Sequence, residues 1–166
     1  TYNSISNGGE ILLDGTNTYT GNTTINSNGR SVGVYLNGKL GGSAHNYAGN
    51  INIGSGGTLS LNHTDRTTPN VTFSGIISGA GGITKKRDNT NAIFTGANTF
   101  TGALKIENGT LTVGGKGALG ANNDNTYAGN ISISADAKLH YTSTTAQKLT
   151  GTISLGFPLF LSLIHI

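Results

Sequence analysis

The 166-residue chain contains no cysteine, methionine or tryptophan and only two prolines. The absence of cysteine excludes disulfides, thiolate metal ligands and cysteine nucleophiles together. Charged residues make up 10% of the chain, well below the roughly 25% of typical soluble domains, so water is met mainly by hydroxyl and amide side chains. No stripe of lysine and arginine interleaved with aromatic residues occurs, and nucleic acid is therefore not a predicted partner.

The chain also lacks helical periodicity, because its apolar residues occur in pairs two positions apart, which is the period of a β-strand. Glycine, asparagine, aspartate or serine residues bound each pair, so the sequence predicts strands of about four to five residues separated by turns, with almost no helix. The pairs are Ile51 and Ile53, Leu59 and Leu61, Val71 and Phe73, Leu104 and Ile106, Leu111 and Val113, Ile131 and Ile133, and Leu139 and Tyr141.

Internal repetition is the strongest signal in the sequence. GTNTYTG at residues 15–21 returns as GANTFTG at residues 96–102, and YAGN at residues 47–50 returns at residues 127–130. The order and the spacing of the repeated segments are both kept. We therefore predict two copies of one element of about 80 residues, with residues 1–79 as the first copy and residues 80–160 as the second.

The repeated heptads themselves favour a structural role. The glycines suit turns, and Asn17 and Asn98 are expected to hydrogen-bond backbone groups at a corner. Tyr19 in the first copy is replaced by Phe100 in the second. A binding site built on a phenol would not tolerate that exchange easily, so we expect the ring to pack rather than to bind a ligand.

Short strands at regular spacing are compatible with sandwiches, barrels and β-solenoids. Tandem copies favour a solenoid, because each unit then contacts mainly its neighbours. LKIENGTLTV at residues 104–113 is ambiguous, since Asn-Gly is the favoured turn of a hairpin and also suits a corner between consecutive strands of a coil. We predict an all-β parallel solenoid, and the alternative is an antiparallel β-sandwich.

SGAGGITK at residues 78–85 and FTGANTFTGALKIENGTLTVG at residues 94–114 resemble the autotransporter-associated β-strand repeat, or passenger-associated transport repeat. In that family a G-G-[LI]-T-K element precedes T-G-x-N-T-[YF]-T-G, a strand and an N/A-G-T-L turn. LLDGTNTYTGNTTIN at residues 12–26 keeps the core motif and departs after it. The resemblance implies a right-handed parallel β-helix, in the passenger of a type V secreted protein.

The resemblance also implies a location and a partner. Such a passenger is exported across the outer membrane of a Gram-negative bacterium by a C-terminal β-barrel on the same polypeptide, and it lies at the cell surface or is released. We expect a structural stalk that supports adhesion or displays an effector. The alternative is an adhesin segment that binds host glycans or extracellular proteins directly, through outward Asn, Thr, Tyr and Lys side chains. Loss of glycan binding on replacement of the loop TDRTTPN at residues 64–70 would support it. Self-association through open solenoid ends is also expected.

Catalysis is not predicted, although polysaccharide-processing enzymes also use parallel β-helices. Such enzymes need paired carboxylates or a calcium site. The acids of this chain fall at scattered positions of the repeat, and no pair can be assigned to adjacent turns. We therefore expect no catalytic, cofactor-binding or metal site and no cofactor. The seven acids are Glu10, Asp14, Asp65, Asp88, Glu107, Asp124 and Asp136.

The remaining polar clusters are interpreted as surface. His63, Asp65 and Arg66 form the nearest approach to an acid–base group and are interpreted as a polar loop. His45 lies in a turn-rich stretch, and His140 is expected to point outward; no histidine has the spacing of a zinc site. The basic cluster at residues 85–87 (KKR) is predicted to be a solvated loop.

An ice-binding face is a weaker alternative. It needs Thr-x-Thr at the same place on every turn of a solenoid, whereas here the threonine motif of the first copy returns only in the second copy.

The two ends of the chain need separate treatment. TYNSISNGGE at residues 1–10 does not resemble a signal peptide, and the chain is interpreted as an internal fragment. FPLFLSLIHI at residues 157–166 is apolar but too short to span a bilayer as a helix, which takes about 20 residues. LSLIHI is also the translation of the start of a widely used transposase sequencing adapter. We therefore predict that residues 161–166 are adapter read-through rather than native sequence.

Overall fold

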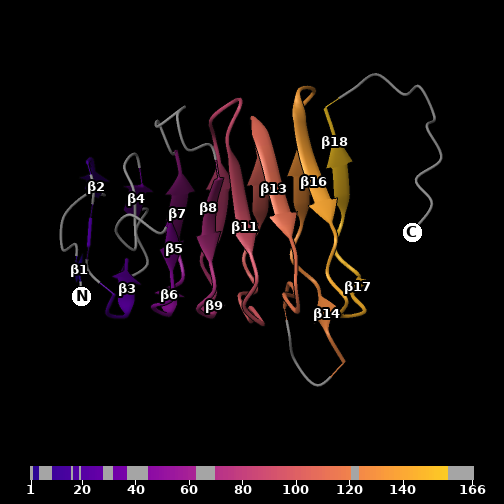
Figure 1. Cartoon of the computed structure of the whole chain (residues 1–166), viewed down its shortest axis with the longest axis horizontal. Coiled ribbons are helices and arrows are strands. Elements are labelled where there is room, and N and C mark those ends of the chain that lie inside the picture. The colour runs from indigo at the N-terminus through magenta and orange to yellow at the C-terminus, as the bar shows by residue number, and fades with distance from the viewer. Residues whose placement is uncertain are drawn as a thin grey trace.

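The computed structural model describes residues 2–3, 9–15, 17–18, 20–27, 32–36, 45–62, 70–120 and 124–156. These residues form strands and turns that coil around one horizontal axis in Figure 1. Every strand pair is parallel. Within these ranges, no helix has the length and apolarity to cross a membrane.

The coil has three faces, which the chain visits in the order 1, 2, 3. Face 1 holds β1 (Tyr2–Asn3), β3 (Thr23–Asn26), β6 (Ile51–Ile53), β9 (Ile77–Ser78), β14 (Thr126–Tyr127) and β17 (Lys148–Leu149). Face 2 holds β2 (Gly9–Leu13), β4 (Val32–Leu36), β7 (Gly57–Leu61), β10 (Gly82–Lys85), β12 (Leu104–Ile106), β15 (Ile131–Ile133) and β18 (Ile153–Leu155). Face 3 holds β5 (Asn46–Tyr47), β8 (Asn70–Phe73), β11 (Asn91–Phe94), β13 (Gly109–Val113) and β16 (Ala137–Tyr141).

The coil is right-handed. In Figure 1 the strands of face 3 lie toward the viewer and point down, those of face 2 lie behind and point up, and the chain advances from left to right. The right-handed parallel β-helix is therefore confirmed, and the alternative of an antiparallel sandwich is wrong, because no antiparallel pairing occurs among the described strands. Residues 104–113 form a corner between β12 on face 2 and β13 on face 3 rather than a hairpin.

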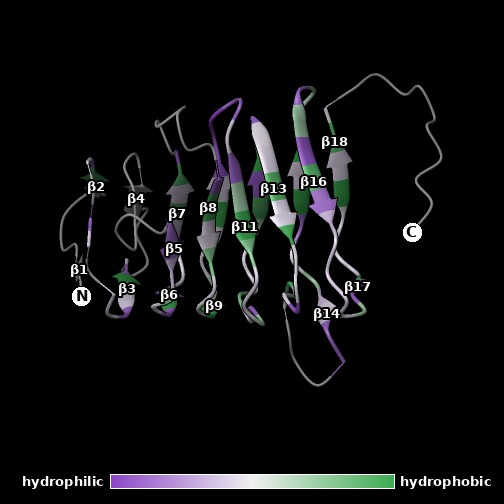
Figure 2. Cartoon of the chain, in the orientation of Figure 1, coloured by the Kyte–Doolittle hydropathy of each residue, from purple (hydrophilic) through white to green (hydrophobic). Residues whose placement is uncertain are grey.

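The predicted apolar pairs line the interior of the coil, except that Tyr141 in the last pair is exposed. Each pair falls in a strand, and the alternation is visible as banded strands in Figure 2. On face 2, Leu59, Ile83, Leu104 and Ile131 stack in register, and each is at most 2% exposed. Single-residue rows of this kind suffice because the interior is narrow. A low apolar content therefore still gives a continuous core.

Aromatic rings fill the interior behind face 3. The rings of Tyr47 and Phe73 lie 6.4 Å apart, and those of Phe73 and Phe94 lie 5.7 Å apart. Both pairs meet edge to face, which is a favourable arrangement of the ring quadrupoles. All three residues stand at the same register position on successive turns, so the aromatic row sets the alignment of face 3.

Equivalent positions of the two sequence copies lie on different faces. Tyr47 lies in β5 on face 3 and pairs through Phe73 and Phe94 to Val113, three turns later on the same face. Tyr127 is the equivalent of Tyr47 in the second copy. It lies in β14 on face 1, the strand that follows β13. The repeat therefore advances three turns plus one face, and each copy is rotated by a third of a turn relative to the last.

Lys85 occupies an interior position, between Leu61 and Ile106 in the register of face 2. It is 1% exposed, so the prediction of a solvated loop is wrong for this residue. Its Nζ donates hydrogen bonds to the carbonyl oxygen of Arg87 at 2.6 Å and to Oγ1 of Thr90 at 2.8 Å. The ammonium group thus closes the interior at the corner between faces 2 and 3, where it satisfies turn oxygens that lack strand partners.

We expect the stability of the protein to rise with pH above about 8. Burial lowers the pKa of Lys85 from its usual 10.5 to about 8, with Asp88 acting in the opposite direction. Because the unfolded chain then binds the proton more tightly than the folded chain, stability is lowest below that pKa and increases as the pH rises toward the unfolded value. Urea unfolding midpoints measured between about pH 8 and pH 10 should therefore increase.

Lys85→Met is the matched control for this titration, because it keeps a long apolar stem and removes the titrating group. Its unfolding midpoint should vary less with pH over the same range. Parallel pH profiles for the two proteins would show that Lys85 does not carry the effect.

Candidate binding groove on face 2

The repeated heptad at residues 96–102 is built into the scaffold. The Asn98 side chain is fully buried, and its Nδ2 donates to the carbonyl oxygens of Gly96 and Ala118, both at 3.0 Å. Its Oδ1 accepts a hydrogen bond from the backbone N–H of Ile77 at 2.9 Å. One amide therefore ties together three successive turns on face 1, in the stretch between β9 and β14 where the ladder of this face is interrupted.

The tyrosine of YAGN fastens the last glycine of the heptad. Tyr127 donates from its hydroxyl to the carbonyl oxygen of Gly102 at 2.6 Å, and Tyr47 donates in the same way to Gly21 in the first copy. Phe100 is fully buried with its ring 5.2 Å from that of Tyr127. Burial raises the pKa of Tyr127. The two repeated motifs thus contact each other between turns: the tyrosine of YAGN donates to the last glycine of the heptad.

These contacts test the expectation that the heptads are structural. Asn98 confirms it, and Asn17 makes the same local bond, from Nδ2 to the carbonyl oxygen of Gly15 at 3.4 Å. Phe100 packs inside the coil as expected, whereas Tyr19 lies outside the described residues. The amide of Asn98 and the carbonyl oxygen of Gly102 in the second heptad are thus already used within the protein.

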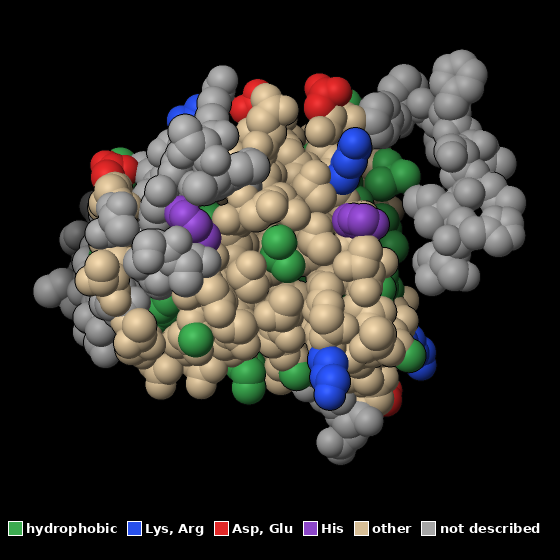
Figure 3. All heavy atoms as spheres, viewed as in Figure 1, with side chains coloured by type: hydrophobic (Ala, Val, Ile, Leu, Met, Phe, Trp, Pro, Cys, Tyr) green, Lys and Arg blue, Asp and Glu red, His purple; other side chains and the backbone are tan. Residues whose placement is uncertain are grey.

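Three acidic residues lie at the same corner of the coil, which the sequence did not indicate. Asp88, Glu107 and Asp136 each lie in the turn between face 2 and face 3, on three consecutive turns. The expectation of scattered registers is wrong for these three, and Figure 3 shows acidic side chains along the upper edge. Even so, no group of three or more His, Asp or Glu residues in the described ranges could hold a metal ion.

The histidines do not form a site among the described residues. His140 is exposed on the outer side of face 3, as predicted, and His45 lies at a corner with a φ of 50°. The cluster of His63, Asp65 and Arg66 lies outside the described residues. Figure 3 shows face 3, which is mostly backbone and uncharged polar side chains with few charges.

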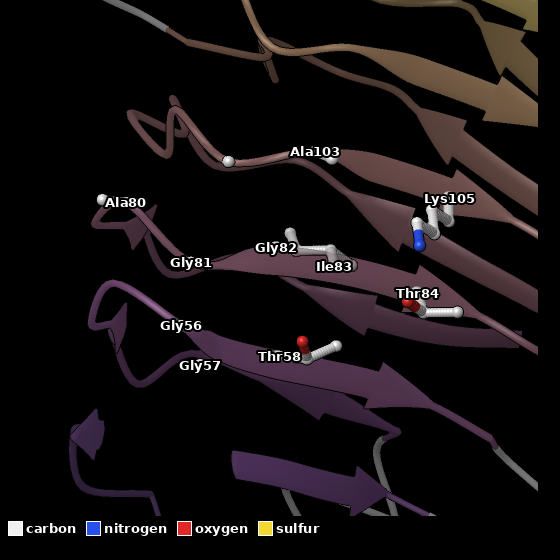
Figure 4. Close-up of a pocket in the computed structure, with 11 residues that line it drawn as sticks. Gly56, Gly57, Thr58, Ala80, Gly81, Gly82, Ile83, Thr84, Ala103 and Lys105 are labelled. Atoms are coloured by element: carbon white, nitrogen blue, oxygen red, sulfur yellow. The ribbon is translucent and has the colours of Figure 1, made fainter. Parts of the chain in front are cut away.

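A groove of about 240 Å³ crosses three turns on the outer side of face 2. Its floor comes from the starts of β7 and β10 and the segment before β12, where Gly56 and Gly57, residues 80–82 (AGG), and Ala103 lie one above another (Figure 4). Gly102 also lines the groove and stacks on Gly81. Short side chains at all three levels leave the backbone accessible. The sequence showed these glycines only as turns, because the stacking of distant turns is not visible in it.

Three polar side chains stand along the groove, namely Thr58, Thr84 and Lys105 (Figure 4). Thr84 is paired in register with Lys105 on the next turn. It is only 6% exposed, although it lies on the outer side of the strand. Its hydroxyl makes no hydrogen bond within the described part of the chain. From the alternation of inward and outward residues, the sequence could have predicted that these three side chains point outward. It could not have predicted that they lie close together.

Comparison with known proteins supports the repeat that the sequence resembles. Residues 7–30 and 91–113 match the family model of the passenger-associated-transport-repeat. Each match contains one of the two heptads. The chain therefore carries the passenger repeat of autotransporters, as the sequence resemblance predicted.

The chain is also similar to one curated protein. The chain is 33% identical over 110 residues, or 66% of its own length, to the adhesin BmaC autotransporter of Brucella suis biovar 1 (strain 1330). It spans only 2% of the length of that protein. No solved structure matches the chain significantly.

We expect Gly102→Ala to destabilise the protein by about 3 kcal/mol. A Cβ at this position would lie 2.1 Å from the carbonyl oxygen of Gly81, which is backbone and cannot move aside independently. The equivalent change in the first copy, Gly21→Ala, meets no atom within 4 Å and should alter stability by no more than about 0.5 kcal/mol. Urea unfolding of both variants measures the difference, and equal effects would contradict the stacking.

Tyr127→Phe should cost about 1–3 kcal/mol, because it leaves the carbonyl of Gly102 without a buried donor. Tyr141→Phe is the matched control, since that hydroxyl also donates to a backbone carbonyl, the one of Thr145, but at an exposed position. It should cost about 0.5 kcal/mol or less. Thermal or urea unfolding distinguishes them, and a neutral Tyr127→Phe would show that packing alone holds the ring.

Proposed function

We propose that the chain is a structural segment of a bacterial autotransporter passenger, a β-helical stalk that holds an adhesive or effector region away from the outer membrane. The observation that carries this proposal is the use of both repeated motifs for contacts between turns, in a coil that matches the passenger repeat. Neighbouring strands lie about 4.8 Å apart, so the seven-stranded face corresponds to a reach of roughly 30 Å.

Location and partner follow from the same proposal. A passenger of this kind lies at the cell surface or is released from a Gram-negative bacterium, and its partner is a C-terminal β-barrel translocator on the same polypeptide. An enzymatic role is not proposed, because no carboxylate is among the described residues that line the groove on face 2 and the relative from Brucella is an adhesin by name. The division at residues 79 and 80 stays a prediction, as does self-association through the solenoid ends.

A second candidate function is direct adhesion through this segment. The groove on face 2 favours it, because its polar side chains are not used by the scaffold. The relative from Brucella is an adhesin by name. The loop TDRTTPN begins outside the described residues.

Surface display tests the stalk function. The chain would be placed between an N-terminal antigen-binding domain and an autotransporter β-barrel in Escherichia coli, with a flexible Gly/Ser linker of equal length as the control. We expect intact cells to capture antigen on large beads when the chain is present, and to capture free antigen but fewer beads with the linker, because a coil gives height that a collapsed linker does not. Failure of export, or equal bead capture by both fusions, would contradict the stalk.

A further inference from the structure

We propose that the groove on face 2 is a subsite for an acidic sugar, a single pyranose ring that carries a carboxylate. Lys105 would pair with the carboxylate, and Thr84 and Thr58 would bind ring hydroxyls. The inference goes beyond the stalk function. Its test uses the chain alone, so either proposal can fail while the other stands.

The first argument is the state of Thr84. Thr84 is 6% exposed, and its hydroxyl has no hydrogen-bond partner among the described residues. Its oxygen is not one of their fully buried unpartnered atoms, so it opens into the groove, where water or a ligand can bind it. The residue lines the groove and its side chain points outward from β10 (Figure 4). A hydroxyl donates one hydrogen bond and accepts up to two, so it suits a ligand hydroxyl in either role.

The second argument is charge. Among the described residues that line the groove, Lys105 is the only charged one. No ion pair of this lysine occurs within the described part of the chain. Figure 4 shows its amino group on the side facing Thr84. A cation beside a hydroxyl, with no carboxylate in the lining, favours a ligand that brings its own negative charge.

The third argument is size and shape. Pockets for drug-sized ligands usually measure about 300–1,000 Å³, and the groove is smaller, at about 240 Å³. It has room for one ring rather than for a folded chain or a large cofactor. Gly82 lies on the same outer side of β10 as Thr84, and the absence of a side chain there lets a ligand approach the backbone closely. No aromatic side chain lines the groove, so polar contacts must supply most of the affinity, and binding of one ring should be weak.

Titration of the full chain with tetragalacturonate tests the proposal, with backbone amide NMR shifts as the readout. We expect shifts centred on Gly81, Gly82, Thr84 and Lys105, with a Kd on the order of 1 mM. The fully methyl-esterified tetramer has the same rings without the charge and should bind at least about tenfold more weakly, because the charge-assisted contact is lost. Binding should weaken as salt is added.

Variants separate this site from a general attraction of the basic chain. Lys105→Gln should raise the Kd at least about tenfold, and Thr84→Val, which keeps the shape, should raise it about three- to tenfold. Lys138→Gln removes an exposed lysine of face 3 and should leave the Kd unchanged. Unfolding midpoints of all three variants verify that they are folded.

The proposal is overturned by any of four results. These are no shifts at the groove with about 20 mM ligand, twenty times the expected Kd; equal binding of the methyl ester; an unchanged Kd in Lys105→Gln; and an equal loss in Lys138→Gln. A tetraglutamate peptide that binds the groove as tightly as tetragalacturonate would also overturn it, because the site would then recognise charge on a peptide rather than an acidic sugar.

Discussion

The close stacking of one turn on the next is the constraint from which the rest of the structure follows. Strands pair in parallel at about 4.8 Å, so each corner must repeat in shape at that spacing, and a side chain on the wrong side of a corner meets the carbonyl of its neighbour. Glycine therefore recurs where backbone meets backbone, as at Gly102 over Gly81. Where face 1 has no regular ladder, Asn98 and Tyr127 supply the missing contacts between turns.

The rotation of the repeat limits what a repeated motif can do in this protein. Because each copy advances three turns plus one face, the heptad lies after β2 in the first copy and after β11 in the second, on different sides of the coil. Equivalent side chains of successive copies then point in different directions and cannot build one flat recognition face. An ice-binding array needs such a face. The rotation of the copies therefore disfavours ice binding, as the wide spacing of the threonine motifs already did.

Most of this fold was predicted from the two-residue period of the strands, the residue types in the turns and the spacing of the repeats. These signals depend on residues that are close in sequence. They could not predict which turns lie side by side, because successive turns of face 2 differ in length: the step from Ile83 to Leu104 is shorter than the step from Leu104 to Ile131. Alignment of the two sequence copies hid the common corner of Asp88, Glu107 and Asp136 for that reason. Lys85 was wrongly predicted to be solvated, because lysine is rarely buried. Its hydrogen-bond partners lie in a turn, and no sequence pattern reveals them.

The groove takes its residues from both sequence copies, and its polar side chains, unlike the scaffold residues, do not recur between the copies. Residues that hold the turns together recur at the repeat offset, as Tyr47 and Tyr127 do. Three of the groove residues do not, since Thr58 aligns with Lys138, Lys105 with Thr24, and Gly57 with Ala137. Mutation in such a protein can alter the unshared positions freely, because no contact between turns depends on them. A passenger assembled from these repeats would therefore keep one stacking rule throughout and carry its binding chemistry at the places where the copies differ.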